Sequence, residues 1–288
     1  MLPTRTMFKG EWQSKLQNDN VFVNGQIMAF EDATGRKGRK GYDKCIVVDD
    51  EIIHVCSKQY GMLHNEHFFS RVEEGLIHAD ITYATRSINR DNRTFAVDYI
   101  LDDERYAVNV KESKDIIRPM LRFVNSYDGS QKTTGHLGFF RQICSNGLHI
   151  AEQKIGFRVK HSGDIVEVVM PRIDELVEQF MDNEYYELQR KFVALADEEI
   201  SDMQKFVRDI CKDTKIFQFD ASETNTDPSK NARMVIEIMQ SESAILKVKP
   251  NKWIGFNAFN QVLHSKLKKT FSVQQDVDAS LFETVLSY

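Results

Sequence analysis

The segment formed by residues 116–150 places the strongest constraint on the fold. Two extended stretches rich in apolar residues are joined there by Asp128-Gly129, a dipeptide favoured in tight turns between strands. Such a turn reverses the chain, so we expect the two stretches to pair as an antiparallel hairpin. Gly129 is expected to adopt a positive φ, which glycine tolerates at little steric cost.

Further strands are predicted on both sides of this hairpin. Alternating apolar residues between positions 76 and 110, beginning with Ile77, are typical of strands with one buried face, and polar breaks occur at residues 89–92 and 102–104. Residues 157–159 add a short strand. Together these segments predict an antiparallel meander of about five or six strands.

The remainder of the chain carries helical periodicity. Apolar residues recur at helical spacing from Pro171, placed in a first turn, to Ile210, as one long helix or two separated near Asp182-Asn183. Asp227-Pro228 is expected to begin another helix. Two more are predicted around residues 256–263 and 281–286.

These patterns predict an α+β fold, with an antiparallel β-meander in the N-terminal half packed against a helical C-terminal half. Residues 1–170 would form a mostly β domain with basic hairpins, and residues 171–288 a helical region that packs on it. One continuous domain remains the alternative. A chain of 288 residues is long enough for either arrangement.

Charge is distributed unevenly along the chain. The formal net charge is -5, and all of this excess lies after residue 170, whereas residues 116–160 contain basic side chains opposed only by Asp128 and Glu152. A locally cationic sheet in an acidic protein suggests an anionic partner. For Arg141 the sequence leaves two readings open, contact with phosphate or pairing with a carboxylate across the sheet.

A second basic segment, residues 35–41, places four cations between glycines. Such a loop could arrange its charges and N–H groups around phosphates, and the alternative is a solvated loop that serves solubility. Near the hairpin turn, Tyr127 could stack on a base, although Asn, Asp and Gly in this turn also have a purely structural explanation. The predicted nucleic-acid-binding residues are Arg36, Lys37, Arg39, Lys40, Arg118, Arg122, Tyr127, Lys132 and Arg141.

Three blocks of the sequence resemble the phage/plasmid-like family of unknown function, found on prophages, plasmids and phage genomes. The central block matches at Asn125, Ser126, Asp128, Gly129, Ser130, Arg141, Cys144 and Asn146, with Tyr127 in place of the usual His. The opening block covers residues 45–49 and 55–66, and the closing block runs from Trp253 to Ala258 and continues to His264. The resemblance implies kinship and a mobile-element context, but no agreed activity.

No complete catalytic or metal-binding pattern is visible. His64 and His67 lie three residues apart without a third ligand of matching spacing, residues 102–104 are explained by a turn, and the four cysteines include no Cys-x-x-Cys pair. Cys144, with His136 or His149, is interpreted as a structural thiol. We therefore expect no cofactor, no metal and no catalytic residues.

No segment has the apolar character of a signal peptide or of a membrane span, so a cytoplasmic location in an infected or element-carrying cell is expected, without a membrane partner. The leading hypothesis is a non-enzymatic phage or mobile-element protein that binds nucleic acid, with single-stranded DNA favoured, in replication or recombination. One alternative is a modulator of host proteins or defence, which would use the acidic residues 184–187 and 197–199. A metal-dependent nuclease is the other, and self-association stays open.

Overall fold

The structure, a computed structural model, describes residues 16–102, 107–109, 115–141, 147–148, 156–181, 185–222, 225–266 and 271–288. Its contacts divide the chain into two compact units. Unit 1 comprises residues 1–104, 120–137 and 153–183, and unit 2 comprises residues 105–119, 138–152 and 184–288. The predicted α+β class is confirmed, because antiparallel sheets dominate the first half of the chain and helices the second.

The principal sheet is the predicted meander. Its strands follow the order β10-β8-β7-β5-β4, and every pairing described between them is antiparallel. The strands are β4 (Tyr83–Arg90), β5 (Thr94–Leu101), β7 (Ile116–Ser126), β8 (Thr133–Arg141) and β10 (Gly156–Val159). In unit 2, β6 (Val108–Asn109) pairs with the start of β7, and β9 (Gly147–Leu148) pairs with the end of β8.

Left-handed residues close the turns of this sheet. Gly129, between β7 and β8, has φ of 65°, as the sequence predicts, and the Asp128 carboxylate accepts a hydrogen bond from the backbone N–H of Ser130 at 3.0 Å. Between β4 and β5, Asp91 and Asn92 have φ of 53° and 54°. Positive φ at both central residues matches the right-handed twist of the flanking strands, which explains the predicted break at residues 89–92.

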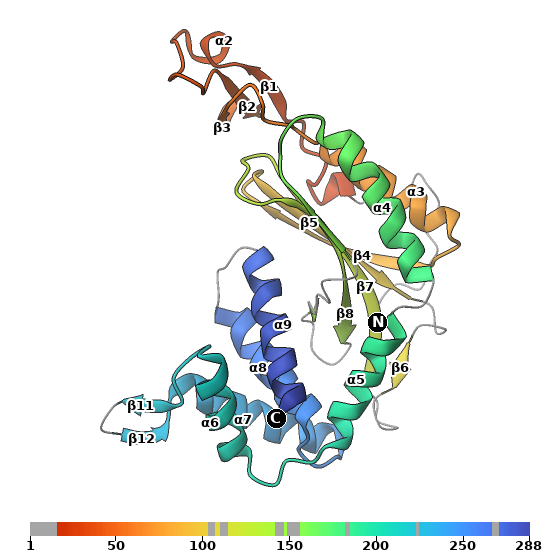
Figure 1. The fold of residues 1–288 in the computed structure, drawn as a ribbon, viewed down its shortest axis with the longest axis vertical. Coiled ribbons are helices and arrows are strands. Elements are labelled where there is room, and N and C mark those ends of the chain that lie inside the picture. The colour runs from red at the N-terminus through yellow and green to blue at the C-terminus, as the bar shows by residue number, and fades with distance from the viewer. Residues whose placement is uncertain are drawn as a thin grey trace. The chain divides into compact units, whose positions relative to one another are not determined.

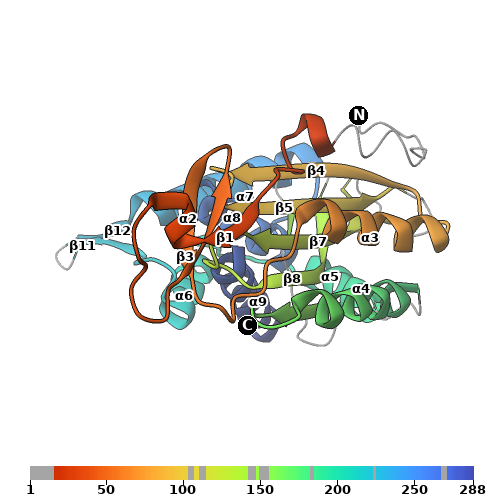
Figure 2. The same ribbon diagram turned by 90° about the horizontal axis from the view of Figure 1, so that it is seen from above.

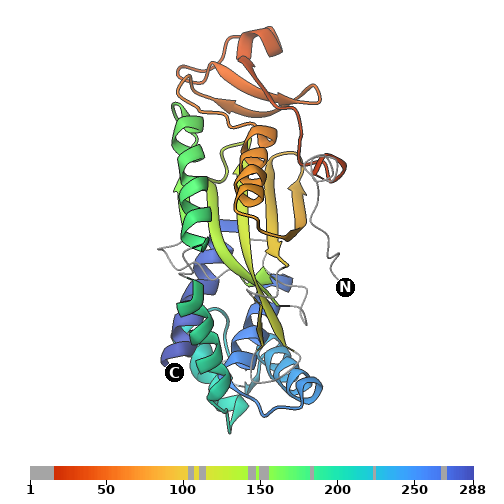
Figure 3. The ribbon, with the colours of Figure 1, turned by 90° about the vertical axis from the view of Figure 1, so that its right-hand side faces the viewer.

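Two helices cover one face of the sheet in unit 1, α3 (Asn65–His78) and α4 (Ile165–Met181) (Figures 1 and 3). Phe68 of α3 meets Phe123 of β7 edge to face, with ring centroids 5.9 Å apart. Arg71 of α3 donates to Asp174 of α4 at 2.6 Å. The prediction that a strand begins at Ile77 was wrong, because α3 continues through Ile77 and the chain turns at Asp80 before β4.

A smaller sheet completes unit 1 (Figure 2). It contains β1 (Gln26–Ala29), β2 (Lys44–Val48) and β3 (Glu51–Cys56) in that order, all antiparallel. The short helix α2 (Phe30–Thr34) follows β1, and the basic segment 35–41 connects α2 to β2. Asp49 and Asp50 form the two-residue turn from β2 to β3, with φ of 49° and 64°.

The helices of unit 2 are α5 (Tyr185–Asp197), α6 (Met203–Thr214), α7 (Lys230–Leu246), α8 (Lys252–Lys266) and α9 (Phe271–Ser287). Between α6 and α7, strands β11 (Asp220–Ser222) and β12 (Asn225–Pro228) form a hairpin that extends away from these helices (Figure 1). Aromatic rings fill the centre of the unit. Phe192 of α5 contacts Phe139, Trp253 and Phe282, at centroid distances of 4.7, 5.0 and 5.6 Å.

Several helix boundaries differ from the predicted ones. The segment after Pro171 forms three described helices, and the first begins six residues earlier at Ile165, so that Pro171 lies inside α4. Asp182-Asn183 lies outside the described residues. Helix α7 begins after Ser229, whose hydroxyl accepts from the N–H of Ala232, and Pro228 belongs to β12. Serine is a strong N-cap, which explains the shift from Asp227-Pro228.

A buried charge cluster joins three parts of unit 2. The Arg141 guanidinium donates to Asp115 at 2.8 Å and to Glu242 of α7 at 2.7 Å. The Trp253 indole N–H also donates to Asp115, at 3.0 Å. Arg141 is fully buried and Glu242 is 5% exposed, so the two carboxylates compensate an arginine that solvent does not reach.

We predict that Arg141→Met lowers the free energy of unfolding by about 3–5 kcal/mol, because it leaves Asp115 and Glu242 buried without their cation. Arg190→Met is the control. Its Glu187–Arg190 pair, also in unit 2, is 71% and 77% exposed, and it should cost less than about 1 kcal/mol. Urea unfolding followed by far-ultraviolet circular dichroism measures both, and equal small losses would contradict the stabilising role of the cluster.

Candidate functional site

The structure separates the nine predicted nucleic-acid-binding residues into an exposed and a buried group. The exposed side chains are Arg36, Lys37, Arg39, Lys40 and Lys132. The buried ones are Arg118, Arg122, Tyr127 and Arg141, with exposed fractions of 8%, 3%, 1% and 0%. For Arg118, Arg122 and Tyr127, the expectation of a surface position was wrong. Of the two interpretations left open for Arg141, the structure shows the pairing with carboxylates in unit 2.

Two of the four cations of segment 35–41, Arg39 and Lys40, lie on a defined turn, and Arg36 and Lys37 precede it. The N–H of Tyr42 donates to the carbonyl of Arg39 at 2.8 Å, and the two residues form an antiparallel bridge. Gly41, the third residue of this turn, has φ of 85°, a conformation that favours glycine. Residues opposite each other in such a bridge have neighbouring side chains, so the turn holds a cation beside an aromatic ring that is 54% exposed.

Side-chain partners do not neutralise these cations within the described part of the chain. No ion pair or side-chain hydrogen bond of Arg36, Lys37, Arg39 or Lys40 is found there. By contrast, the Nζ atom of the neighbouring Lys58 lies 3.2 Å from the Oδ2 atom of Asp43. We refer to residues 36–42 as the basic loop.

The two ends of the small sheet differ in charge. The basic loop enters β2 at Lys44, whose pairing partners are Ala29 and Cys56. Asp49, Asp50 and Glu51 lie at the opposite end, where Val48 pairs with Glu51. Glu31 and Asp32 of α2 and Asp43 also lie at the end of the loop, so that end carries both signs of charge with an excess of cations, whereas the turn at the opposite end carries three carboxylates.

Arg122 is part of an ionic row across the principal sheet. Asp98 of β5 pairs in register with Arg86 of β4 and Arg122 of β7, and both guanidinium groups donate to its carboxylate. Burial raises the pKa of Asp98, but the charges and hydrogen bonds of Arg122 and Arg86 outweigh that effect and hold the pKa below its usual value.

His136 lies close to this row. Its burial, together with the nearby charge of Arg122, lowers its pKa to about 3, so the imidazole is neutral near pH 7. The arginines and the histidine thus belong to an internal arrangement of unit 1. Asp98, which the sequence analysis did not select, is the residue that explains why Arg122 is buried.

Tyr127 has a structural role at the start of the hairpin turn. Its hydroxyl donates to the carbonyl of Val23 at 2.9 Å and accepts from the N–H of Asn65 at 3.0 Å. The Asn65 amide oxygen in turn accepts from Asn125 at 2.8 Å. These contacts connect the hairpin to the beginning of α3. They give Asn125 and Tyr127, both in the central block of the family resemblance, a structural role that requires no ligand.

A surface pocket of about 490 Å³ opens beside the start of α3. Its lining residues include His64, Glu66 and His67, the pair of histidines considered as metal ligands, with their neighbouring glutamate. Among the described residues, no group of three or more His, Cys, Asp or Glu side chains is arranged to hold a metal ion. Of residues 102–104, only Asp102 lies in the described part, and Cys144 and His149 lie outside it.

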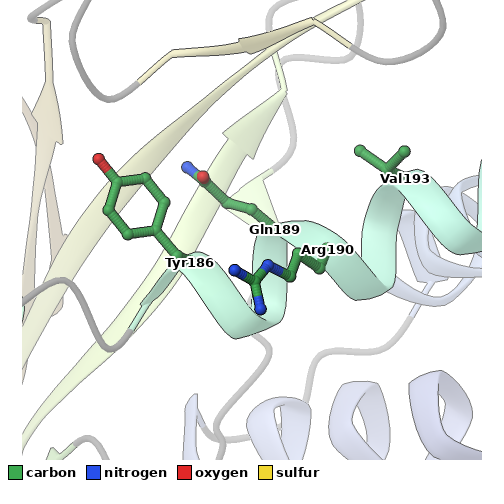
Figure 4. Close-up of a pocket in the computed structure, with 4 residues that line it drawn as sticks. All are labelled: Tyr186, Gln189, Arg190 and Val193. Atoms are coloured by element: carbon green, nitrogen blue, oxygen red, sulfur yellow. The ribbon is translucent and has the colours of Figure 1, made fainter.

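A second pocket, of about 370 Å³, lies on α5 in unit 2. It is lined by Tyr186, Gln189, Arg190 and Val193, which follow one another along the helix (Figure 4). The pocket contains one charged group, and that group is the Arg190 guanidinium, already paired with Glu187 at 2.8 Å. It is a shallow apolar hollow rather than a set of groups converging on a ligand.

The acidic stretch 197–199, considered as a protein-binding surface, has partners within unit 2. A carboxylate oxygen of Glu198 lies 2.5 Å from the Nζ atom of Lys252, and a carboxylate oxygen of Glu199 lies 2.8 Å from the Nζ atom of Lys249. Of the stretch 184–187, Glu184 lies outside the described residues, and Glu187 is paired with Arg190. These pairs reduce the negative charge that either stretch could offer to a partner.

In the described ranges, none of the helices combines the length and the apolar character needed to cross a bilayer.

Comparison with known families gives one match over most of the chain. The profile of the family described as a domain of unknown function (DUF932) covers residues 52–282, a range that includes the principal sheet and all of the helices from α3 to α8. No curated protein and no solved structure matches the chain.

We predict that acid destabilises unit 1 through the buried His136 and the half-buried His161. The unfolded chain binds a proton at a histidine near pH 6.5, whereas His136 does so only near pH 3 and His161 near pH 4. The unfolded state therefore holds more protons between these values, and stability is lost as the pH falls from about 6.5 towards 4, by up to about 1.4 kcal/mol per pH unit for each histidine.

The contribution of His136 can be isolated by substitution. His136→Gln should flatten the dependence of the unfolding free energy on pH, while His67→Gln, at an exposed position of α3, should leave it unchanged. Denaturant unfolding at a series of pH values tests this. Identical slopes in both variants and in the natural protein would show that His136 is accessible to protons in the folded state.

Proposed function

The chain belongs to the DUF932 family of domains of unknown function, and we propose that it binds single-stranded nucleic acid through its basic loop. The proposed setting is the replication or recombination of a phage or other mobile element, as the resemblance of its sequence blocks to phage and plasmid proteins implies. Binding rather than chemistry is proposed, because the described residues offer no set of catalytic groups around the loop.

One observation carries this proposal: the basic loop exposes four cations that have no side-chain partners among the described residues, and its turn from Arg39 to Tyr42 also exposes a tyrosine. Each cation that meets a phosphate releases a condensed counterion, which is favourable and independent of sequence. Cations already paired with carboxylates would have to break those pairs first. Arg36, Lys37, Arg39 and Lys40 avoid that cost.

The exposed ring of Tyr42 favours a single strand over a duplex. Single-strand binders combine positive charge with aromatic side chains, because the faces of unpaired bases are available for stacking. In a duplex those faces are covered by neighbouring base pairs. Arg39 beside Tyr42 brings both elements within one bridge, so that a phosphate and its base could be held together.

The competing functions lack a comparable observation in the described residues. A protein-binding role for the acidic stretches would rely on carboxylates of which Glu187, Glu198 and Glu199 already have partners. A nuclease would need clustered metal ligands, and none is found where the structure is described. We therefore take nucleic-acid binding as the function to test first.

We predict that reversal of Arg36, Lys37, Arg39 and Lys40 to Glu weakens binding of a single-stranded oligonucleotide at least about tenfold at moderate salt. The slope of log affinity against log salt concentration should also fall, by about 0.7 for each phosphate that the variant no longer neutralises. Fluorescence anisotropy over a range of salt concentrations measures both quantities.

A variant of equal charge provides the control. Lys212, Lys215, Lys230 and Arg233 are exposed cations of unit 2, and their replacement by Glu changes the net charge by the same amount. This control should retain most of the affinity and the salt slope. If both variants lose affinity equally, binding depends on overall charge rather than on the basic loop, and if the natural protein does not bind, the proposed function is wrong.

A further inference from the structure

The small sheet carries an uncharged, mostly apolar face next to the basic loop. Two rows of paired residues define it: Gln26, Val47 and Ile52 form one row, and Met28, Cys45 and Val55 form the other. Within a strand, residues two apart point to the same side, and the irregularity after Ile46 brings Ile52 and Val55 of β3 to the same side as well. We call this surface the Met28 face.

Solvent reaches the edges of the Met28 face in spite of its composition. Ile52 and Val55 of β3 are each 37% exposed, and Met28 and Val47 are partly exposed, whereas Cys45 between Met28 and Val55 is fully buried. The small sheet and its loop contain four of the large hydrophobic side chains that are most exposed in the described chain, Ile27, Tyr42, Ile52 and Val55. Of these four, Ile52 and Val55 share the Met28 face, Ile27 points to the opposite side, and Tyr42 lies on the basic loop.

The charges around the Met28 face restrict the kinds of ligand that could bind to it. The row with Met28 and Val55 lies toward Lys44 and the basic loop, and the row with Ile52 lies toward the acidic turn at Asp49 and Asp50. An occupant should therefore be apolar where it meets the face and anionic where it meets the loop. A single strand of nucleic acid has both properties, since its bases present apolar faces and its phosphates line one side.

We propose that the Met28 face receives bases of the single strand whose phosphates contact the basic loop, an inference that rests on the proposed function. Three strands about 4.8 Å apart and two rows about 7 Å apart provide a patch of roughly 10 by 7 Å. This area accommodates only a few nucleotides. Because phosphates are repelled from the acidic turn, the row of Val55 makes the closer contact and the row of Ile52 the weaker one.

The test compares an oligothymidine of about 20 nucleotides with an abasic oligonucleotide of equal length and charge. The natural protein should bind the oligothymidine at least about fivefold more tightly, since only that ligand offers bases. Replacement of Ile52 and Val55 by Thr preserves β-branching and removes most of the apolar surface. The double variant should lose that preference while it retains its affinity for the abasic ligand.

Ile27→Thr is the matched control. Ile27 has the same exposed fraction of 37% and lies on the same sheet, but its row, with Ile46 and His54, faces the opposite side. It should leave the preference for oligothymidine intact. Far-ultraviolet circular dichroism and melting curves for all variants establish that the small sheet remains folded.

The outcomes separate this inference from the proposed function. Equal binding of both ligands by the natural protein, with weaker binding in the loop variant, would leave the proposed function in place and overturn the role of the Met28 face. A preference that survives in the Ile52/Val55 variant, or that Ile27→Thr abolishes equally, would also overturn it. Failure of the natural protein to bind either ligand would overturn both.

Discussion

Buried arginines with carboxylate partners determine how both units of this protein are arranged internally. In unit 1, Asp98 holds Arg122 and Arg86 in one row across the sheet, and in unit 2, Asp115 and Glu242 enclose Arg141. A buried charge without a partner costs several kcal/mol, so these pairs allow only one register of the strands that carry them. A shift by one residue would turn Arg122 to the other face of β7 and separate it from Asp98.

The same pairs account for part of the positive charge in residues 116–160, where Arg122 and Arg141 are buried with carboxylates while Lys132, Arg158 and Lys160 are exposed. The positive charge of β7 and β8 is largely consumed within the protein, whereas the charge of the basic loop remains available to solvent. At physiological salt, screening limits both the repulsion from the net charge of -5 and the attraction of the basic loop to about 8 Å, so the proposed binding would require a ligand that reaches the small sheet.

Much of the fold could be predicted from local patterns. Alternation and the Asp128-Gly129 dipeptide predicted the hairpin and its glycine, and apolar spacing predicted helices around Phe256 and Leu281, because each depends on neighbouring residues. Burial of Arg122 and Arg141 could not be predicted in this way. Their partners lie 24, 26 and 101 residues away, and Asp115 stands one position outside the segment whose charges suggested a cationic sheet.

The candidate site was predicted only in part for the same reason. The basic loop is local, and its exposure was expected from its glycines and cations. Tyr127 also looked like a surface residue, because a turn is usually exposed, but its hydroxyl reaches Val23 and Asn65, more than sixty residues earlier in the chain. Neighbouring residues determine the backbone conformation of a turn, whereas segments distant in the sequence determine whether its side chains are buried.

The discontinuous composition of the two units has a consequence for synthesis on the ribosome. All residues of unit 1 have been made when position 183 has been added, whereas unit 2 needs segments from residue 105 to residue 288. Asp115 and Arg141 are 26 residues apart and can meet early, but Glu242 follows Arg141 by 101 residues, a delay of about 5–20 s at the usual rates of translation. During that interval Arg141 of the nascent chain lacks Glu242, one of its two carboxylate partners. Unit 1 can fold before all segments of unit 2 have been synthesised.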